Sequence, residues 1–200
     1  MLIPVDEADE IEVKIKVSEE EFNRLKAMMR NHIPADADIT LSLNSILSQM
    51  SDVYYDNKKG DLAGELRCLC IREELFELLP KKYTLAYKDT SFVTNGIRHN
   101  LEYQTDITNK TELHKILLSL GLHILIVVSK ERESFSWDVC TGTGIIKIEF
   151  DKVAQLGHFI EIEAPNSTII DGVVKDLNIV GQREAKPYHK ILLEKIEKEN

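Results

Sequence analysis

Charged and β-branched residues alternate with a period of two through residues 10–17, Glu-Ile-Glu-Val-Lys-Ile-Lys-Val. Successive side chains of a β-strand point to opposite faces of the sheet, so this pattern predicts a strand. The charged residues that would share one face are Glu10, Glu12, Lys14 and Lys16. Ser18-Glu19-Glu20-Glu21 follows as a capping box and predicts a helix that continues to about Arg30.

Further segments typical of strands follow along the chain, with polar turns between them. They cover residues 52–56, 66–72, 83–88, 98–106, 122–132, 145–151 and 158–164. Helices are expected at about 109–120 with Thr108 as its cap, from Asn166 to about 179, and from about Pro187. Mostly consecutive strands with few helices predict an α+β fold, mainly antiparallel β, whose sheet is closed. The length and the lack of a linker predict a single domain over residues 1–200.

Several of these strands carry only full charges on one face. The residues that share a face are Lys147, Glu149 and Asp151 on one strand, Glu161 and Glu163 on the next, and Lys130 and Arg132 on an earlier one. A charged face turned to water explains any single strand of this kind. Taken together, and with amphipathic helices that must cover an apolar outer face, the strands favour a charged face turned inward around a polar lumen.

A lumen of this kind has a specific chemistry. Inward acids repel each other unless a cation joins them, and a hard divalent metal is the natural partner of carboxylates. Inward bases need an anion; without it they are expected to be strained, solvated or neutralised by facing carboxylates. Acids, metal and bases together indicate a site for a polyphosphate, whose charge is shared between metal and basic side chains.

The composition narrows the class of protein. With 34 acidic and 25 basic residues the net charge is -9, which disfavours nucleic acid as a partner. No apolar run is long enough for a membrane span, and residues 1–7 lack the pattern of a signal peptide. The three cysteines, Cys68, Cys70 and Cys140, favour free thiols in a reducing compartment. We therefore expect a cytoplasmic protein with no membrane partner.

At this point the chain resembles a known family. Glu10-Ile11-Glu12-Val13-Lys14 is similar to the Glu-x-Glu-x-Lys signature of the CYTH superfamily, or triphosphate tunnel metalloenzymes. Its members include class IV adenylyl cyclases, thiamine triphosphatases and inorganic tripolyphosphatases. Later segments follow the family's order: Asp52–Asp56, Leu69–Arg72, Leu85–Lys88, Arg98 with Glu102, Lys130 with Arg132, and Phe150–Glu163. The resemblance covers about residues 8–195 and implies a closed eight-stranded β-tunnel, a CYTH-like barrel, with peripheral helices.

The resemblance also implies a set of site residues. Candidate ligands of Mg²⁺ or Mn²⁺ are Glu10, Glu12, Asp151, Glu161 and Glu163. Candidate triphosphate-binding residues are Lys14, Arg72, Lys88, Arg98, Lys130 and Arg132, and Glu102 fits either set. Cys70 departs from the pattern, because the family usually has the first arginine of a pair there. The cysteine at this position implies that the protein binds phosphate more weakly or that its substrate is different. No catalytic residue is singled out, and Tyr188 and the six histidines are expected to pack.

Three functions stay open for a partner that is a small molecule bearing a triphosphate. Hydrolysis is the favoured one, with metal and bases polarising the terminal phosphoryl group while water attacks in line. The second is a class IV adenylyl cyclase, in which the ribose 3′ hydroxyl of ATP attacks the α-phosphate. The third is a non-catalytic binder of polyphosphate or nucleotide, for which Cys70 is the support. The oligomeric state, including a homodimer, also stays open.

Overall fold

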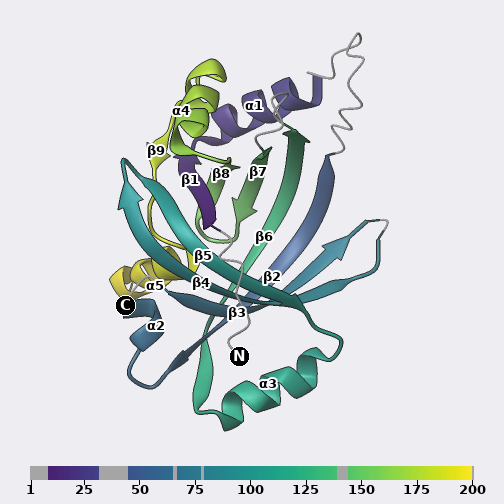
Figure 1. Ribbon diagram of the computed structural model, residues 1–200, viewed down its shortest axis with the longest axis vertical. Helices are drawn as coiled ribbons and strands as arrows, with labels where there is room; N and C mark the ends of the chain where they lie inside the picture. Colours follow the sequence, from purple (N-terminus) through teal and green to yellow (C-terminus); the bar gives the residue numbers. More distant parts are fainter. Residues whose placement is uncertain (1–8, 32–44, 65–66, 78, 139–143, 200) are drawn as a thin grey trace, which may run out of the picture.

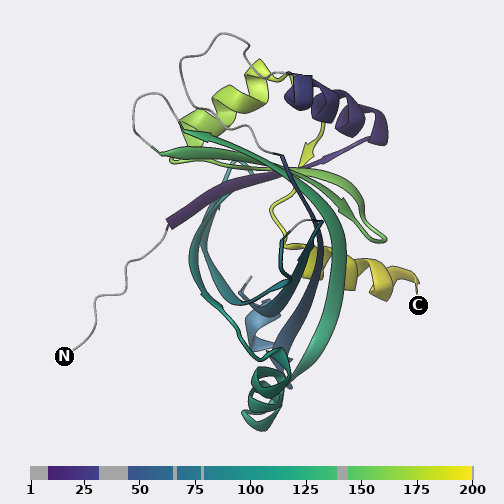
Figure 2. The same cartoon turned by 90° about the vertical axis from the view of Figure 1, so that its right-hand side faces the viewer.

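Eight antiparallel strands close into a barrel in the computed structural model, which describes residues 9–31, 45–64, 67–77, 79–138 and 144–199 (Figure 2). The barrel strands are β1 (Asp9–Val17), β2 (Ile46–Asn57), β3 (Cys68–Phe76), β4 (Lys82–Thr94), β5 (Ile97–Asp106), β6 (Leu122–Asp138), β7 (Ile145–Val153) and β8 (Gly157–Glu163). The order around the barrel is β5-β4-β3-β2-β6-β7-β8-β1, and β1 returns to β5. A two-residue strand, β9 (Gln182–Arg183), adds to β1 from outside. The predicted closed eight-stranded fold is confirmed.

Strand β1 closes the barrel because it pairs with β8 on one side and with β5 on the other. Its alternating sequence gives it two different faces. Val13 and Ile15 point outward and are buried beneath helices, at 0% and 2% exposure. Glu10, Glu12 and Lys14 point into the barrel, as predicted. The perfect alternation therefore serves two environments, an apolar one outside and a charged one inside.

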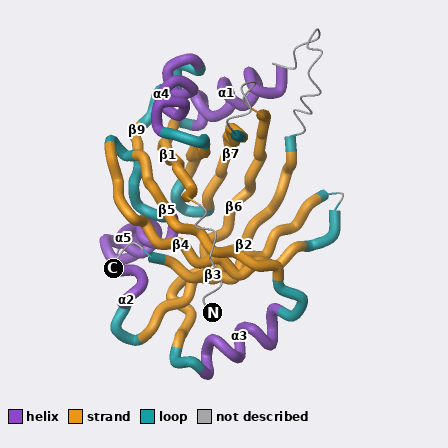
Figure 3. The backbone as a smooth tube through the Cα atoms, in the orientation of Figure 1, coloured by secondary structure: helices purple, strands orange, loops and turns teal. Residues whose placement is uncertain are grey.

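Helices cover the barrel from several sides (Figures 1 and 3). They are α1 (Glu19–Asn31), α2 (Asp61–Gly64), α3 (Lys110–Ser119), α4 (Ser167–Asp176) and α5 (Tyr188–Glu199). Helices α1 and α4 lie over β1, β7 and β8, where Phe22, Leu25 and Ile170 join the main apolar core. Helix α3 packs Leu117 against the outer face of β2 and β3. None of the described helices has the length and apolar composition needed to cross a lipid bilayer.

Helix α5 packs in a different place, at one end of the barrel. Tyr188 and Leu192 contact an apolar cluster that includes Tyr54, Phe159 and Cys70. Tyr54 and Cys70 also line the cavity inside the barrel. The lumen is therefore charged along most of its wall but apolar where α5 closes it.

Several elements differ in their bounds from the sequence-based expectation; β2 and β4, for example, are longer than the segments expected at 52–56 and 83–88. Thr108 was expected to cap α3, but Asn109 does so, and its side-chain oxygen accepts a hydrogen bond from the Glu112 amide. Asn caps a helix at least as well as Thr, and the one-residue shift lies within the usual uncertainty of helix ends. The strand expected at 122–132 extends to Asp138, because its second half pairs with β7 along its full length. Asn166 caps α4 as predicted.

Candidate functional site: a charged tunnel

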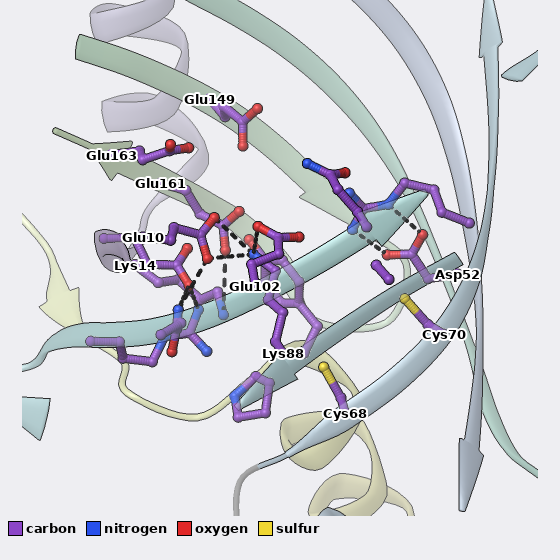
Figure 4. Close-up of a pocket in the computed structure, with 18 of the residues that line it drawn as sticks. Glu10, Lys14, Asp52, Cys68, Cys70, Lys88, Glu102, Glu149, Glu161 and Glu163 are labelled. Carbon is purple, nitrogen blue, oxygen red and sulfur yellow. Dashed lines mark hydrogen bonds and ion pairs between the residues drawn. The ribbon is translucent and has the colours of Figure 1, made fainter. Parts of the chain in front are cut away.

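A cavity of about 570 Å³ lies inside the barrel and is lined by side chains from all eight barrel strands (Figure 4). The acidic residues of its wall are Glu10, Glu12, Asp52, Glu102, Glu149, Glu161 and Glu163. The basic residues are Lys14, Arg72, Lys88, Arg98, Lys130, Arg132 and Lys147. Acids and bases are thus equal in number among the described lining residues. Every sequence-predicted site residue except Asp151 lies on this wall.

Asp151 lies behind the wall and is 0% exposed. Its carboxylate accepts hydrogen bonds from Lys130 at 2.9 Å, from Arg132 at 2.6 Å, and from the hydroxyl of Tyr188 at 2.9 Å. A buried carboxylate needs such partners, because an unpaired charge is costly in an apolar surrounding. In this arrangement Asp151 positions two bases of the tunnel.

Arg132 is the most heavily engaged base of the wall. Its guanidinium contacts Asp151 and Glu161 at 2.5 Å each and forms an ion pair with Glu149. Burial alone would lower the pKa of Arg132, but Asp151 and Glu149 raise that pKa well above its ordinary value. The base stays charged, and the carboxylates occupy its donors.

Lys14 is almost completely buried, at 1% exposure. Its Nζ lies 3.4 Å from Glu161, donates to the carbonyl of Lys186 at 3.2 Å, and lies 4.0 Å from the centre of the Tyr188 ring. Burial and the neighbouring charge of Arg98 lower the pKa of Lys14 to about 8, against the opposing effect of Glu161. Lys14 therefore carries an incompletely compensated charge into the site.

Two further ion pairs join β1 to β4 and β5. Lys88 contacts Glu10 at 2.6 Å and Glu102 at 3.2 Å. Arg98 contacts Glu12 at 2.5 Å, and the Asn100 amide donates to Glu12 at 2.7 Å. These pairs show that the basic side chains are neutralised by facing carboxylates, which was one of the three expected solutions.

The acids are not equally well compensated. Burial opposes the ionised form of Glu161, but Lys14 and Arg132 lower its pKa well below the ordinary value. Burial raises the pKa of Glu163, and the Glu10 and Glu149 carboxylates add to that effect while Lys147 opposes it. The expected mutual repulsion of lumen acids is therefore found at Glu163. Glu161 also repels Glu149, but at Glu161 itself the charges of Lys14 and Arg132 outweigh such repulsion.

Besides Asp52 of β2, two charged members of the wall on β7, Lys147 and Glu149, were missing from the predicted site set. Glu149 has its pKa lowered to about 2, because Arg132 and Lys147 outweigh the effect of burial. Lys147 lies 3.0 Å from Glu149 and 3.5 Å from Glu163. The signal for both was present in the sequence, since they share a strand face with Asp151.

Arg72 and Cys70 form the wall on β3. Arg72 makes two hydrogen bonds to Asp52, at 2.9 and 3.0 Å, and Asp52 is 2% exposed. Cys68 and Cys70 are free thiols, as expected, and burial raises the pKa of both. Cys140 lies outside the described residues.

The acidic wall offers carboxylate oxygens, which are the ligands that hard divalent metals prefer. In the described parts of the chain, no three acidic, histidine or cysteine side chains converge as a ready-made metal site. The donor set nevertheless fits, because Glu10, Glu149 and Glu163 provide carboxylate oxygens, and burial together with the charges of Glu10 and Glu149 raises the pKa of Glu163. These carboxylates would first have to leave their basic partners.

The CYTH domain model matches residues 8–172, so the chain belongs to the CYTH family. The solved structure of PH1819 from Pyrococcus horikoshii is similar, with a TM-score of 0.72, 23% identity, and coverage of 93% of this chain and 99% of that chain. PH1012 from the same organism has a TM-score of 0.65 and 19% identity, covering 90% of this chain and 98% of that one.

A protein from Hippeastrum has the same fold. This protein, HpAC1, is described as a candidate adenylyl cyclase with a dominant triphosphatase activity. Its structure matches with a TM-score of 0.61 and 17% identity. The match covers 90% of this chain and 92% of that chain. At these identities the likeness concerns the fold. A search of curated protein sequences finds no match to this chain.

Proposed function

We propose that this protein is a divalent-metal-dependent enzyme that hydrolyses the triphosphate group of a small molecule. One observation carries the proposal: the barrel encloses a cavity of about 570 Å³ whose wall alternates acidic and basic side chains. Bases of this kind bind phosphate oxygens through charge-assisted hydrogen bonds, and carboxylates hold the accompanying metal. Membership of the CYTH family supports the same class of ligand.

The proposed metal ligands are Glu10, Glu12, Glu161 and Glu163 of the sequence-based set, joined by Glu149. Glu163 and Glu149 lie close enough to affect each other's charge, and Glu163 has the weakest basic contact, at 3.5 Å from Lys147. A bound Mg²⁺ or Mn²⁺ supplies positive charge at the phosphoryl oxygens. Asp151 is assigned a positioning role in place of the metal role, because Lys130, Arg132 and Tyr188 occupy its oxygens.

The proposed triphosphate-binding residues are Lys14, Lys88, Arg98, Lys130 and Arg132. Each is paired with a carboxylate or lies beside one, so the anion would take the place of these carboxylates around the bases. Arg72 would contribute least, because Asp52 holds it with two hydrogen bonds. Glu102 belongs to the network around Lys88.

Turnover assays test the proposal. Tripolyphosphate, thiamine triphosphate and ATP would each be supplied with Mg²⁺ and with Mn²⁺, and both phosphate release and cyclic AMP would be measured. We expect metal-dependent phosphate release that Glu12→Ala abolishes. Lys115→Ala, which removes an exposed base of α3, is the control and should retain activity.

The outcomes separate the three functions. Cyclic AMP with pyrophosphate as the main products would replace hydrolysis by the cyclase reaction. Binding without any product would leave a non-catalytic binder. Release of phosphate at the wild-type rate by Glu12→Ala would contradict the assigned site.

A further inference from the structure

One part of the tunnel wall carries no charge. Along β3 the inward positions after Arg72 are Cys70 and Cys68, and Cys70 is paired in register with Tyr54 of β2 and Ala86 of β4. All four uncharged side chains line the cavity. Figure 4 shows the two sulfur atoms turned toward the interior of the site, on the side away from Glu149 and Glu163. We call Cys68, Cys70, Ala86 and Tyr54 the uncharged wall.

The uncharged wall is backed by apolar packing. Cys70, Ala86 and Tyr54 belong to the apolar cluster that α5 completes through Tyr188 and Leu192. One face of the Tyr54 ring is covered by His189, whose ring centre lies 4.5 Å away. The cavity is therefore bounded on this side by sulfur, methyl and aromatic atoms.

The basic residues next to the uncharged wall, Arg72 and Lys88, are already paired with carboxylates. Arg72, next to Cys70 on the same face, is held by Asp52 at 2.9 and 3.0 Å. Lys88, beside Cys68, is held by Glu10 and Glu102. A phosphate placed against the uncharged wall would lose water without gaining a counter-charge, which is unfavourable. A neutral or aromatic group there would gain contact with polarisable and aromatic atoms.

The short side chains of the uncharged wall also leave room for a ligand. Cys70 and Ala86 lie side by side in register on the neighbouring strands β3 and β4, and both are 3% exposed. A long base at either position would reach into the cavity and fill the space in front of the wall. The short residues leave that space for a ligand.

We propose that the uncharged wall binds the organic part of the substrate, so that the protein acts on an organic triphosphate in preference to inorganic tripolyphosphate. The triphosphate itself would contact the basic side chains of Lys14, Lys130 and Arg132, which line the same cavity. This inference rests on the proposed function of the same site and adds to it the class of substrate.

Cys70→Arg tests the inference, because it places a long base into the space in front of the wall. Dissociation constants would be measured calorimetrically, with Mg²⁺, for tripolyphosphate, ATP and thiamine triphosphate. The wild type should bind at least one organic triphosphate about tenfold more tightly than tripolyphosphate, and Cys70→Arg should remove that preference. Ala86→Leu fills the same space from the next strand without a charge and should act in the same direction. If circular dichroism shows that Cys70→Arg is not folded, the binding preference of Ala86→Leu tests the inference in its place.

Leu75→Arg is the matched control. Leu75 lies on the outer face of β3 and is 39% exposed, so this variant adds the same charge to the same strand outside the tunnel. It should leave the wild-type preference unchanged. Equal or tighter binding of tripolyphosphate by the wild type would overturn the inference while supporting a triphosphate site. Equal weakening of all ligands in both tunnel variants would also overturn it. Failure of the wild type to bind any of the three would overturn the proposed function itself.

Discussion

The hydroxyl of Tyr188 donates a hydrogen bond of 2.9 Å to Asp151, the carboxylate that also holds Lys130 and Arg132. Tyr188 is the first residue of α5, so this bond joins the closing helix to the basic wall of the tunnel. The centre of its ring also lies near two cations, 4.0 Å from Nζ of Lys14 and 5.1 Å from Nζ of Lys130. Packing was expected for Tyr188, and the structure adds a polar contact that positions the bases.

Tyr188→Phe removes this hydrogen bond and retains the ring. A hydrogen bond to a charged, buried acceptor contributes about 1.5–3 kcal/mol, so the free energy of unfolding should fall by about that amount. Binding of tripolyphosphate should weaken as well, because Asp151 loses one of its partners. Chemical denaturation measures the first effect, with Tyr87→Phe on the outer face of β4 as the control. Equal stability of both variants and the wild type would refute the positioning role.

Glu161→Gln and Glu163→Gln should change the stability of the metal-free protein in opposite directions. Glu161 is reached by Lys14 and Arg132, and removing one partner of a buried ion pair costs about 3 kcal/mol. Glu163 is close to Glu10 and Glu149, so neutralising it relieves repulsion. Its side chain is 41% exposed, and water reduces the gain to less than about 1 kcal/mol. Denaturation curves at neutral pH without metal would decide, and a loss of stability in both variants would be inconsistent with this explanation.

Much of the site was predictable because β1, β7 and β8 are covered by helices on one face only. Alternation of charged and apolar residues in 10–17 and 146–151 then gives the face of the strand on which each side chain lies. The apolar end of the lumen was not predictable. Tyr54 and Cys70 meet Leu192 of α5 only after the chain has closed the barrel, and local periodicity carries no information on that contact.

Asp151 and Glu163 show most clearly what the alternation of charged and apolar residues cannot predict. Both alternate inward on their strands and were placed in the same set of metal ligands. The structure gives Asp151 three donors and complete burial, whereas Glu163 lies among acids. Period-two alternation gives the face of a side chain but not its depth or its neighbours across the barrel. A single domain over residues 1–200 stays a prediction.

The stability of the protein should depend on the protonation of His189. This side chain is 1% exposed, and its Nδ1 has no hydrogen-bond partner among the described residues. Burial, with the charges of Lys14 and Lys190, lowers the pKa of His189 to about 4, and Asp56 opposes this only weakly. The unfolded chain binds the proton at a pKa of about 6.5, so stability is lost as the pH falls from about 6.5 to about 4.

His189→Phe keeps a ring against Tyr54 and removes the titrating group. Its free energy of unfolding should decline less steeply than that of the wild type between about pH 6.5 and 4, by about 3 kcal/mol in total. Urea denaturation at several pH values measures the difference. Parallel pH profiles for the two proteins would show that His189 does not contribute.

Arg132→Ala should weaken the binding of tripolyphosphate by about ten- to a hundredfold, because a charge-assisted contact worth about 1.5–3 kcal/mol is lost. The variant also leaves Glu149, Asp151 and Glu161 less well neutralised, which repels the anion further. Lys152→Ala removes an exposed base from the outer face of β7 and serves as the control. Isothermal titration with Mg²⁺ compares the three proteins, and equal affinities would remove Arg132 from the proposed site.

The most direct test of the triphosphate site is the thermal melting of the wild type with Mg²⁺ and increasing tripolyphosphate. A ligand that binds the folded protein at a hundredfold excess over its dissociation constant stabilises it by about 2.7 kcal/mol. For a chain of this length that corresponds to a rise in Tm of about 5–10 °C. We predict a rise that grows with tripolyphosphate concentration and exceeds the rise with Mg²⁺ alone. An unchanged Tm at every concentration, with metal present, would mean that the tunnel does not bind triphosphate.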